Sequence, residues 1–181
     1  MIKLALCGAH GTGKTTILND LSEIFTTIPI LQRSVRSFWE DCGVEDFEKL
    51  PSDIRAQFQK HQLLNQLRRE DIEGQNGFLT DRSVVDYWGY TVLSSNMSDP
   101  DLGLYKELIR SRLLQYSHVV FVPVMFEVKN ERLRANIETR KEVEQIMKSL
   151  IQETLQNNYL LIDSKDHKLR IKKIQNYING K

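Results

Sequence analysis

The stretch that decides the fold is residues 2–15, which read Ile2-Lys3-Leu4-Ala5-Leu6-Cys7-Gly8-Ala9-His10-Gly11-Thr12-Gly13-Lys14-Thr15. Its first six residues are a short, mostly apolar run that Gly8 ends, which is typical of a strand buried on both faces of a sheet. Segment 14–26 spaces its apolar side chains as a helix does, at Ile17, Leu18, Leu21, Ile24 and Phe25. The sequence therefore predicts a buried strand, a glycine-rich turn and an amphipathic helix in direct succession.

The turn at residues 8–15 satisfies the pattern G-x-x-x-x-G-K-[ST] in full. A chance match in a chain of ordinary composition is on the order of one per cent. Glycines let the backbone N–H groups point inward and hold anionic oxygens, and the dipole of the following helix favours negative charge. In this motif Lys14 reaches the β- and γ-phosphates of a nucleoside triphosphate, and the hydroxyl of Thr15 binds Mg²⁺.

ATP and Mg²⁺ are therefore the expected cofactors. The predicted nucleotide-binding residues are those of the loop and the first helical turn, namely Gly8, His10, Gly11, Thr12, Gly13, Lys14, Thr15 and Thr16. We expect the His10 side chain to fill the loop and point to solvent rather than to act in catalysis.

Four further short apolar segments predict strands, and segments with helical spacing separate them. The expected strands are residues 28–32, 78–81, 118–125 and 159–162, and the expected helices lie within 34–73, 84–93, 102–114, 142–155 and 168–178. This alternation predicts an α/β three-layer sandwich with a five-stranded parallel sheet, the fold of P-loop nucleoside triphosphate hydrolases. One domain spanning residues 1–181 is expected, since no repeat or linker interrupts the chain.

The composition is that of an ordinary globular protein, with 27% charged and 40% hydrophobic residues. The net charge of +1 does not favour a nucleic-acid partner, although local basic segments are compatible with one. The longest apolar stretches run to about seven residues, whereas a membrane span needs about 20, so no membrane contact is expected. Two cysteines, Cys7 and Cys42, favour the cytoplasm, or the host cytoplasm for a viral protein. The oligomeric state stays open, with a homodimer among the candidates.

An acid closes the predicted strand at residues 78–81. Asp81 is expected to hold Mg²⁺ or to accept the proton of an attacking hydroxyl, because both roles need an ionised oxygen near the γ-phosphate. The planar guanidinium of Arg82 can donate two parallel hydrogen bonds to a phosphate. The alternative is a structural ion pair with Asp86 or Glu40. Ser83 is expected to cap the helix that follows.

The sequence lacks the N-K-x-D motif of switch GTPases and is too short for the second domain of AAA+ machines, which leaves a small P-loop kinase. Residues Thr80-Asp81-Arg82-Ser83 resemble the corresponding step of deoxynucleoside and thymidylate kinases. The whole chain resembles the NadR-like AAA-domain kinases of bacteria and phages, in which a phosphate loop is followed by D-R, a strand ending in V-P and an arginine-bearing segment.

This resemblance implies a lid at residues 127–142, whose arginines stabilise the transferring phosphoryl group and exclude water. It places the lid arginine at Arg132 or Arg134, although the Asp-Gly that precedes it in the family is replaced here by Asn130-Glu131. Arg140 is a third candidate for a contact with the nucleotide. Together with Lys14 and Asp81, Arg132 and Arg134 complete the expected catalytic set.

The resemblance also implies that the helices at residues 34–73 form the pocket of the phosphate acceptor. The candidate substrate-binding residues are Arg33, Glu40, Gln59, Arg82 and Tyr87. A glutamine amide can pair with the edge of a base, and an arginine can hold a phosphate. Each of these side chains also has a structural alternative, in the core or on a solvated helix face.

The sequence thus predicts an ATP-dependent phosphotransferase that acts on a small-molecule acceptor, namely a nucleoside, a nucleotide or a related ribosyl compound. Two alternatives stay open at this point. One is a kinase that acts on a hydroxyl of DNA, at a 5′ end or a hydroxymethylated base. The other is a nucleotide-binding regulatory module that hydrolyses its nucleotide slowly and signals through a partner.

Overall fold

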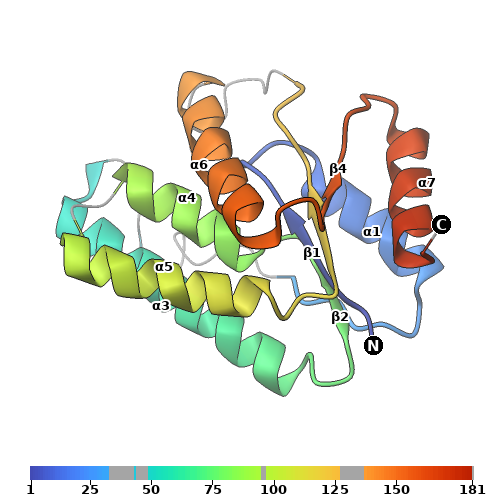
Figure 1. Ribbon diagram of the computed structural model, residues 1–181, viewed down its shortest axis with the longest axis horizontal. Coiled ribbons are helices and arrows are strands. Elements are labelled where there is room, and N and C mark those ends of the chain that lie inside the picture. The colour runs from blue at the N-terminus through green and yellow to red at the C-terminus, as the bar shows by residue number, and fades with distance from the viewer. Residues whose placement is uncertain (33–42, 44–48, 95–96, 127–136, 181) are drawn as a thin grey trace.

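The computed structural model describes residues 1–32, 43, 49–94, 97–126 and 137–180 (Figure 1). Its elements are, in chain order, β1 (Lys3–Cys7), α1 (Lys14–Ile24), α3 (Ser52–Ile72), β2 (Phe78–Thr80), α4 (Val84–Ser94), α5 (Asp99–Leu113), β3 (His118–Phe121), α6 (Ile137–Leu155), β4 (Leu160–Leu161) and α7 (His167–Ile178). None of these helices combines the length and the apolar character that a membrane span requires.

The strands form a parallel sheet in the order β2-β1-β3-β4. The first strand therefore lies inside the sheet, where Leu4 pairs with Leu79 on one side and Ala5 pairs with Val119 on the other. Since all strands run in the same direction, their carboxyl ends meet at one edge, which is where ligands bind on such sheets.

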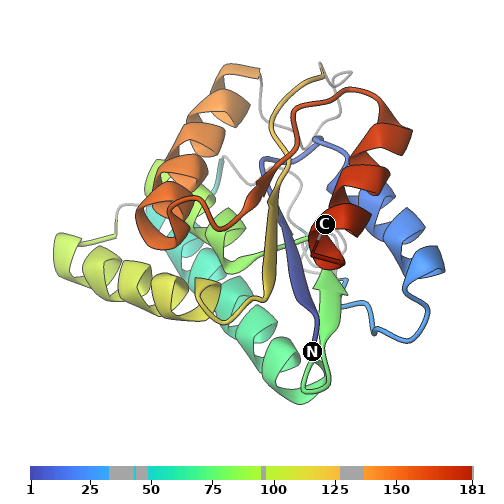
Figure 2. The ribbon, with the colours of Figure 1, turned by 45° about the vertical axis from the view of Figure 1, so that its right-hand side comes forward.

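Helices cover both faces of the sheet, which confirms the predicted three layers (Figures 1 and 2). Along β1, Leu4 and Leu6 belong to a core that includes residues of α1 and α7. The alternating Ala5 and Cys7 belong to a second core with residues of α3, α4, α5 and α6. Side chains of a strand alternate between its faces, so a short apolar run supplies both cores.

The strand predicted at residues 28–32 is reduced to a single bridge, in which Ile30 pairs in parallel with Leu79. Two backbone hydrogen bonds of 2.9 Å hold it, from Leu31 N to Leu79 O and from Leu79 N to Pro29 O. The sheet of the described residues therefore has four strands, and the prediction of five was wrong in this detail. Pro29 supplies a physical reason, because proline has no N–H to donate to a ladder.

A buried carboxylate joins three helices near the start of α4. Glu70 of α3 is 1% exposed, and its Oε1 accepts hydrogen bonds of 2.8 Å from Gln66 Nε2 and from the Tyr116 hydroxyl. Arg112 of α5 lies 3.9 Å from its other oxygen. The Tyr116 hydroxyl also accepts a hydrogen bond of 3.3 Å from Val84 N, so the cluster fixes the position where α4 begins. Burial raises the pKa of Glu70, and the hydrogen bonds from Gln66 and Tyr116 oppose this shift.

Glu70→Gln is expected to change how stability depends on pH. The unfolded chain releases this proton at about pH 4.3, whereas the folded chain retains it to higher pH, so stability falls as pH rises between the two pKa values. Glu70 lowers the free energy of unfolding by at most about 1.4 kcal/mol for each unit by which the pH rises in this range. The Gln variant does not show this pH dependence, although its amide oxygen can still accept hydrogen bonds. In urea unfolding, the free energy of unfolding of wild type relative to that of the variant should be higher at about pH 5 than at about pH 7. Parallel pH profiles would contradict this prediction.

Candidate functional site

The phosphate loop follows β1 at the carboxyl edge of the sheet and leads into α1, which begins at Lys14. Three of its glycines have positive φ, with values of 143° at Gly8, 71° at Gly11 and 93° at Gly13. Side-chain-bearing residues rarely adopt this conformation, so the glycine spacing of the motif meets a real backbone requirement. The predicted strand, turn and helix at residues 2–26 are confirmed.

Gly8→Ala is expected to destabilise the protein strongly. A Cβ atom at this position would lie 2.3 Å from the carbonyl oxygen of Val122, on the backbone of the neighbouring segment after β3. Backbone strain alone costs roughly 1–3 kcal/mol, and the clash adds to it. Thermal unfolding should show a large drop in midpoint.

Gly103→Ala is the matched control for this substitution. Gly103 lies within α5, and a Cβ atom there meets nothing within 4 Å. Alanine in a helix interior is favoured by roughly 0.5–1 kcal/mol over glycine, so this variant should be slightly more stable. Equal effects of the two substitutions would show that the close approach at Gly8 does not matter.

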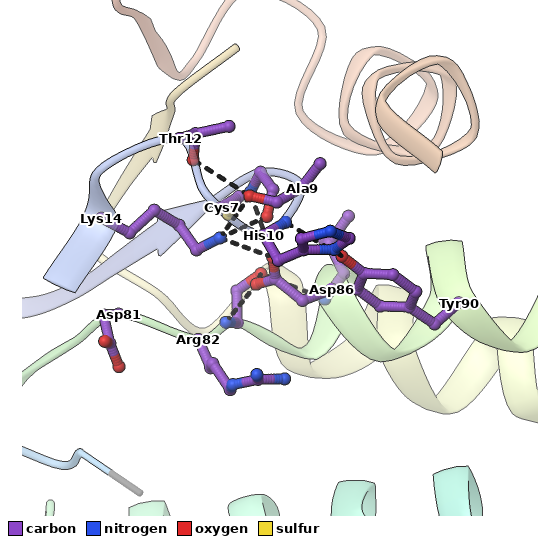
Figure 3. A network of polar contacts seen from close by, with 12 residues as sticks. Cys7, Ala9, His10, Thr12, Lys14, Asp81, Arg82, Asp86 and Tyr90 are labelled. Carbon is purple, nitrogen blue, oxygen red and sulfur yellow. Dashed lines mark hydrogen bonds and ion pairs between the residues drawn. The ribbon is translucent and has the colours of Figure 1, made fainter. Parts of the chain in front are cut away.

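Lys14 lies folded against the loop that precedes it (Figure 3). Its ammonium donates to the carbonyl oxygen of Gly8 and, at 2.9 Å, to that of Ala9. It also lies 3.7 Å from Oδ1 of Asp86, whose side chain is 2% exposed. Burial lowers the pKa of Lys14, with the nearby Arg82 acting in the same direction and Asp86 opposing it.

Asp86 is a residue of this site that the sequence reasoning assigned no function. Its Oδ1 accepts a hydrogen bond of 3.1 Å from Gly8 N, and its Oδ2 accepts from Ser83 N at 2.6 Å and from Ser83 Oγ at 2.9 Å. Ser83 Oγ accepts from Val85 N at 3.2 Å, which confirms Ser83 as a helix cap. The sequence signal was the S-x-x-D spacing of a capping box before an apolar run.

Thr15 and Asp81, the two predicted Mg²⁺ ligands, lie in direct contact. Thr15 Oγ1 donates a hydrogen bond of 2.6 Å to Asp81 Oδ2, and Gln32 Nε2 lies 3.4 Å from the same oxygen. A hydroxyl and a carboxylate are the hard oxygen donors that Mg²⁺ prefers, with phosphates and waters completing its shell. Among the described residues no group of three or more His, Cys, Asp or Glu could hold a metal ion.

His10 and Tyr90 of α4 lie side by side at the outer part of the loop. The Tyr90 hydroxyl accepts a hydrogen bond of 2.9 Å from His10 N and lies 2.7 Å from His10 Nδ1. The two rings stack with their centroids 6.0 Å apart. The His10 side chain therefore packs against α4 through Tyr90, and the expectation that it points to solvent was wrong.

The described substrate-binding candidates are Arg82, Tyr87 and Gln59. Arg82 is half-buried and follows Asp81, and Figure 3 shows both side chains extending to the same side of the chain. Within the described residues no ion pair joins Arg82 to Asp86, because Asp86 pairs with Lys14. Tyr87 is 4% exposed, and burial raises its pKa to about 12 although Arg82 lowers it.

Gln59 lies on α3 and is 6% exposed. Two more buried amides, Gln62 and Gln66, continue the row along this helix. Gln66 Nε2 contacts the carbonyl oxygen of Arg82 at 3.4 Å. Gln62 is 3% exposed, and its amide nitrogen has no hydrogen-bond partner among the residues that the structure describes. The sequence drew attention to Gln59 and Gln62 but placed only Gln59 among the predicted substrate-binding residues, because only the fold shows which amides are buried.

Four predicted site residues, Arg33, Glu40, Arg132 and Arg134, lie outside the residues that the structure describes. Within the predicted lid, residues 137–142 form the first turns of α6. Arg140 in these turns is 2% exposed and donates its Nε to the carbonyl oxygen of His10 at 3.0 Å. It thus contacts the phosphate loop itself.

Comparison with known proteins gives a family and a set of structural neighbours. A family model described as an AAA domain matches residues 3–170. No curated protein matches the chain. The structure of deoxyadenosine kinase from M. mycoides with the products dCMP and a flexible dCDP has a TM-score of 0.72 at 18% identity, and the match covers 99% of each chain.

A second neighbour is the NadR protein in complex with NAD and AMP-PNP, with a TM-score of 0.71 at 18% identity. The match covers 99% of this chain and 50% of the NadR chain, so the chain spans about half the length of that protein. NadR in complex with NR gives a TM-score of 0.71 at 19% identity. Matches at identities this low establish a shared fold and nothing beyond it.

Proposed function

Since the chain belongs to this AAA-domain family, we propose that it is an ATP-dependent phosphotransferase that acts on a nucleoside, a nucleotide or a related ribosyl compound. The observation that carries the proposal is the 2.6 Å contact between Thr15 and Asp81, which puts a carboxylate beside the phosphate loop. Such a carboxylate is what a loop that binds a triphosphate needs in order to transfer its terminal phosphoryl group.

The loop and Lys14 supply the donor half of the proposed site. The backbone N–H groups at the start of α1 and the Lys14 ammonium offer positive charge to the β- and γ-phosphates. Thr15 and Asp81 are the residues that would hold Mg²⁺, which neutralises charge on those phosphates. Lys14 leaves its carbonyl partners at Gly8 and Ala9 when it turns toward phosphate oxygens.

The transfer step follows from these positions. The acceptor oxygen attacks the γ-phosphorus, the bond from that phosphorus to the β–γ bridging oxygen breaks, and ADP leaves with the electron pair. Where the acceptor is an alcohol and Asp81 acts as the base rather than as a metal ligand, the proton of that alcohol passes to the carboxylate of Asp81. A phosphate acceptor needs no base, so in that case Asp81 contributes only its negative charge and takes up no proton.

The row of buried amides on α3 supports a neutral, hydrogen-bonding acceptor group. Gln62 Nε2 is buried and has no hydrogen-bond partner within the described part of the chain, and an unpaired buried donor is costly unless a ligand satisfies it. The hydroxyl of Tyr87 on α4 is an uncharged donor at neutral pH, since a tyrosine ordinarily has a pKa of about 10 and burial raises the pKa of Tyr87 further, to about 12. Amides and hydroxyls match the edges of a base or of a nicotinamide-type ring.

The structural neighbours support the same class of acceptor. Deoxyadenosine kinase is described with dCMP, dATP and dCTP bound, and NadR with NAD, AMP-PNP and NR. These ligands combine a ribosyl or deoxyribosyl unit with a ring, and several also carry phosphates.

One transfer assay tests the proposal. The protein is incubated with γ-labelled ATP, Mg²⁺ and separate acceptors, namely nucleosides, nucleoside monophosphates, nicotinamide riboside and a DNA duplex with free 5′ hydroxyls. We expect label in a small-molecule product and its loss in Lys14→Ala. Binding of ATP without transfer to any acceptor would favour a regulatory module and overturn the kinase proposal, and transfer to DNA alone would replace the acceptor class.

A further inference from the structure

Two buried arginines from opposite sides of the sheet reach the phosphate loop. Arg140 of α6 is 2% exposed and Arg170 of α7 is 3% exposed. Arg140 Nε donates to the carbonyl oxygen of His10 at 3.0 Å, and Arg170 Nη1 donates to the carbonyl oxygen of Thr12 at 3.3 Å. Each guanidinium therefore holds a different carbonyl of the loop, two residues apart.

Further contacts fix each guanidinium in place. Arg140 Nη1 donates to the carbonyl oxygen of Phe126 at 3.1 Å. Arg170 Nε donates to Ser164 O at 2.6 Å, its Nη2 lies 3.2 Å from Met125 Sδ, and its Cζ lies 5.0 Å from the centre of the Phe126 ring. A planar fork with several fixed partners has little freedom left, so it can hold a backbone carbonyl in one direction.

The direction of a carbonyl determines the direction of the next amide. Every described peptide bond is trans, and in a trans peptide unit the C=O of one residue and the N–H of the next point in opposite directions. The carbonyl of His10 shares its peptide plane with the N–H of Gly11, and that of Thr12 with the N–H of Gly13. When the arginines pull these carbonyls outward, the two amides turn to the inside of the loop.

We infer that Arg140 and Arg170 are positioning residues that pre-orient the Gly11 and Gly13 amides of the loop toward the phosphates of the nucleotide. No described residue accepts a hydrogen bond from either amide, which leaves both N–H groups to an anion. Glycine at positions 11 and 13 adds no side chain to restrain its own peptide unit, so the restraint comes from outside the loop. This inference rests on the proposed function, because it concerns the binding of its phosphoryl donor.

The test measures phosphate binding and amide orientation apart from transfer. Inorganic tripolyphosphate is titrated into protein labelled with ¹⁵N-glycine, which carries nine glycine signals. In Arg140→Met, the shift of the Gly11 amide signal on addition of tripolyphosphate should be lost first. In Arg170→Met, the shift of the Gly13 amide signal should be lost first. Each substitution removes a charge-assisted hydrogen bond to the loop, so the Kd measured by calorimetry should rise roughly tenfold to a hundredfold.

Arg112→Met is the matched control. Arg112 also has a mostly buried side chain, 13% exposed, but it pairs with Glu70 and Asp71 and does not contact the loop. Its Kd for tripolyphosphate should stay within about twofold of wild type. If the methionine variants fail to fold, Arg140→Lys and Arg170→Lys replace them, since lysine keeps the charge but cannot hold two backbone partners at fixed angles.

The outcomes separate this inference from the proposed function. Folded arginine variants that bind tripolyphosphate as wild type does, or that disturb all nine glycine signals equally, would overturn the inference while transfer persists. Weakened binding with selective loss at Gly11 and Gly13 supports it even if no acceptor is ever phosphorylated. A wild-type protein that binds no tripolyphosphate would overturn both.

Discussion

Asp81→Asn is expected to lower kcat for phosphoryl transfer by roughly 10²–10⁴-fold while changing ATP affinity far less. Asparagine has the same shape and can still accept the hydrogen bond from Thr15 Oγ1, so the loop should keep its geometry. What the variant loses is the negative charge, and either proposed role of Asp81 needs that charge. Steady-state kinetics with the acceptor that the transfer assay identifies, together with calorimetric ATP binding, measure the two effects separately.

Asp163→Asn provides the control for the loss of a carboxylate. The Asp163 side chain is 64% exposed and pairs with Lys173 at the surface, so its substitution should leave kcat within about twofold of wild type. If Asp81→Asn turns over at the wild-type rate, Asp81 has no part in the mechanism.

Thr15→Ala distinguishes the two roles of Asp81. If Asp81 holds Mg²⁺ with Thr15, both Thr15→Ala and Asp81→Asn should require more Mg²⁺ for half-maximal activity. If Asp81 is the base, Thr15→Ala alone should raise that requirement. The 2.6 Å contact between the two side chains makes this comparison direct.

Lys14→Ala is expected to reduce transfer by at least about 10²–10³-fold, the effect of removing one electrostatic donor from the transition state. It should also lower stability by about 2 kcal/mol at neutral pH, because it leaves the buried Asp86 carboxylate without its cation. Asp86 keeps its hydrogen bonds from Gly8 and Ser83, so the loss should stay moderate. Activity assays and urea unfolding measure the two losses.

Adding Asp86→Asn to Lys14→Ala separates chemistry from stability. The double variant carries no unpaired buried charge, but its amide NH2 must face the N–H of either Gly8 or Ser83, so its unfolding free energy should recover only part of the loss seen in Lys14→Ala. Transfer should not recover, since the donor to the phosphates is still missing. Recovery of both properties together would show that Lys14 acts only through the fold.

The fold was largely predictable because its signals are local. A run of apolar residues before glycine predicts a buried strand wherever it lies, and β1 and α1 came out as expected. The strand predicted at residues 28–32 did not form in full. Its pairing depends on a neighbour far away in the sequence, and Pro29 limits it to one bridge. The number of strands in a sheet depends on which distant segments pair, and a local sequence pattern does not contain that information.

The site was predictable where consecutive residues of one motif fix their relative positions locally, as Gly8, Lys14 and Thr15 do. Asp86 was missed because its position in α4 explains it as a helix-capping residue, and only the approach of α4 to the loop shows its second contact with Gly8 N. Arg170 was missed for the same reason, since it stands 157 positions beyond Gly13 in a helix that looks merely solvated.

The sequence by itself determined a loop for a nucleoside triphosphate, because eight consecutive residues contain both the backbone freedom and the charges that phosphates require. The tertiary structure alone decided which distant groups support that loop, namely Asp86 beside Lys14, and Arg140 and Arg170 on the carbonyls of His10 and Thr12. These contacts join α4, α6 and α7 to the end of β1, and the packing of helices on a parallel sheet brings them together at one edge.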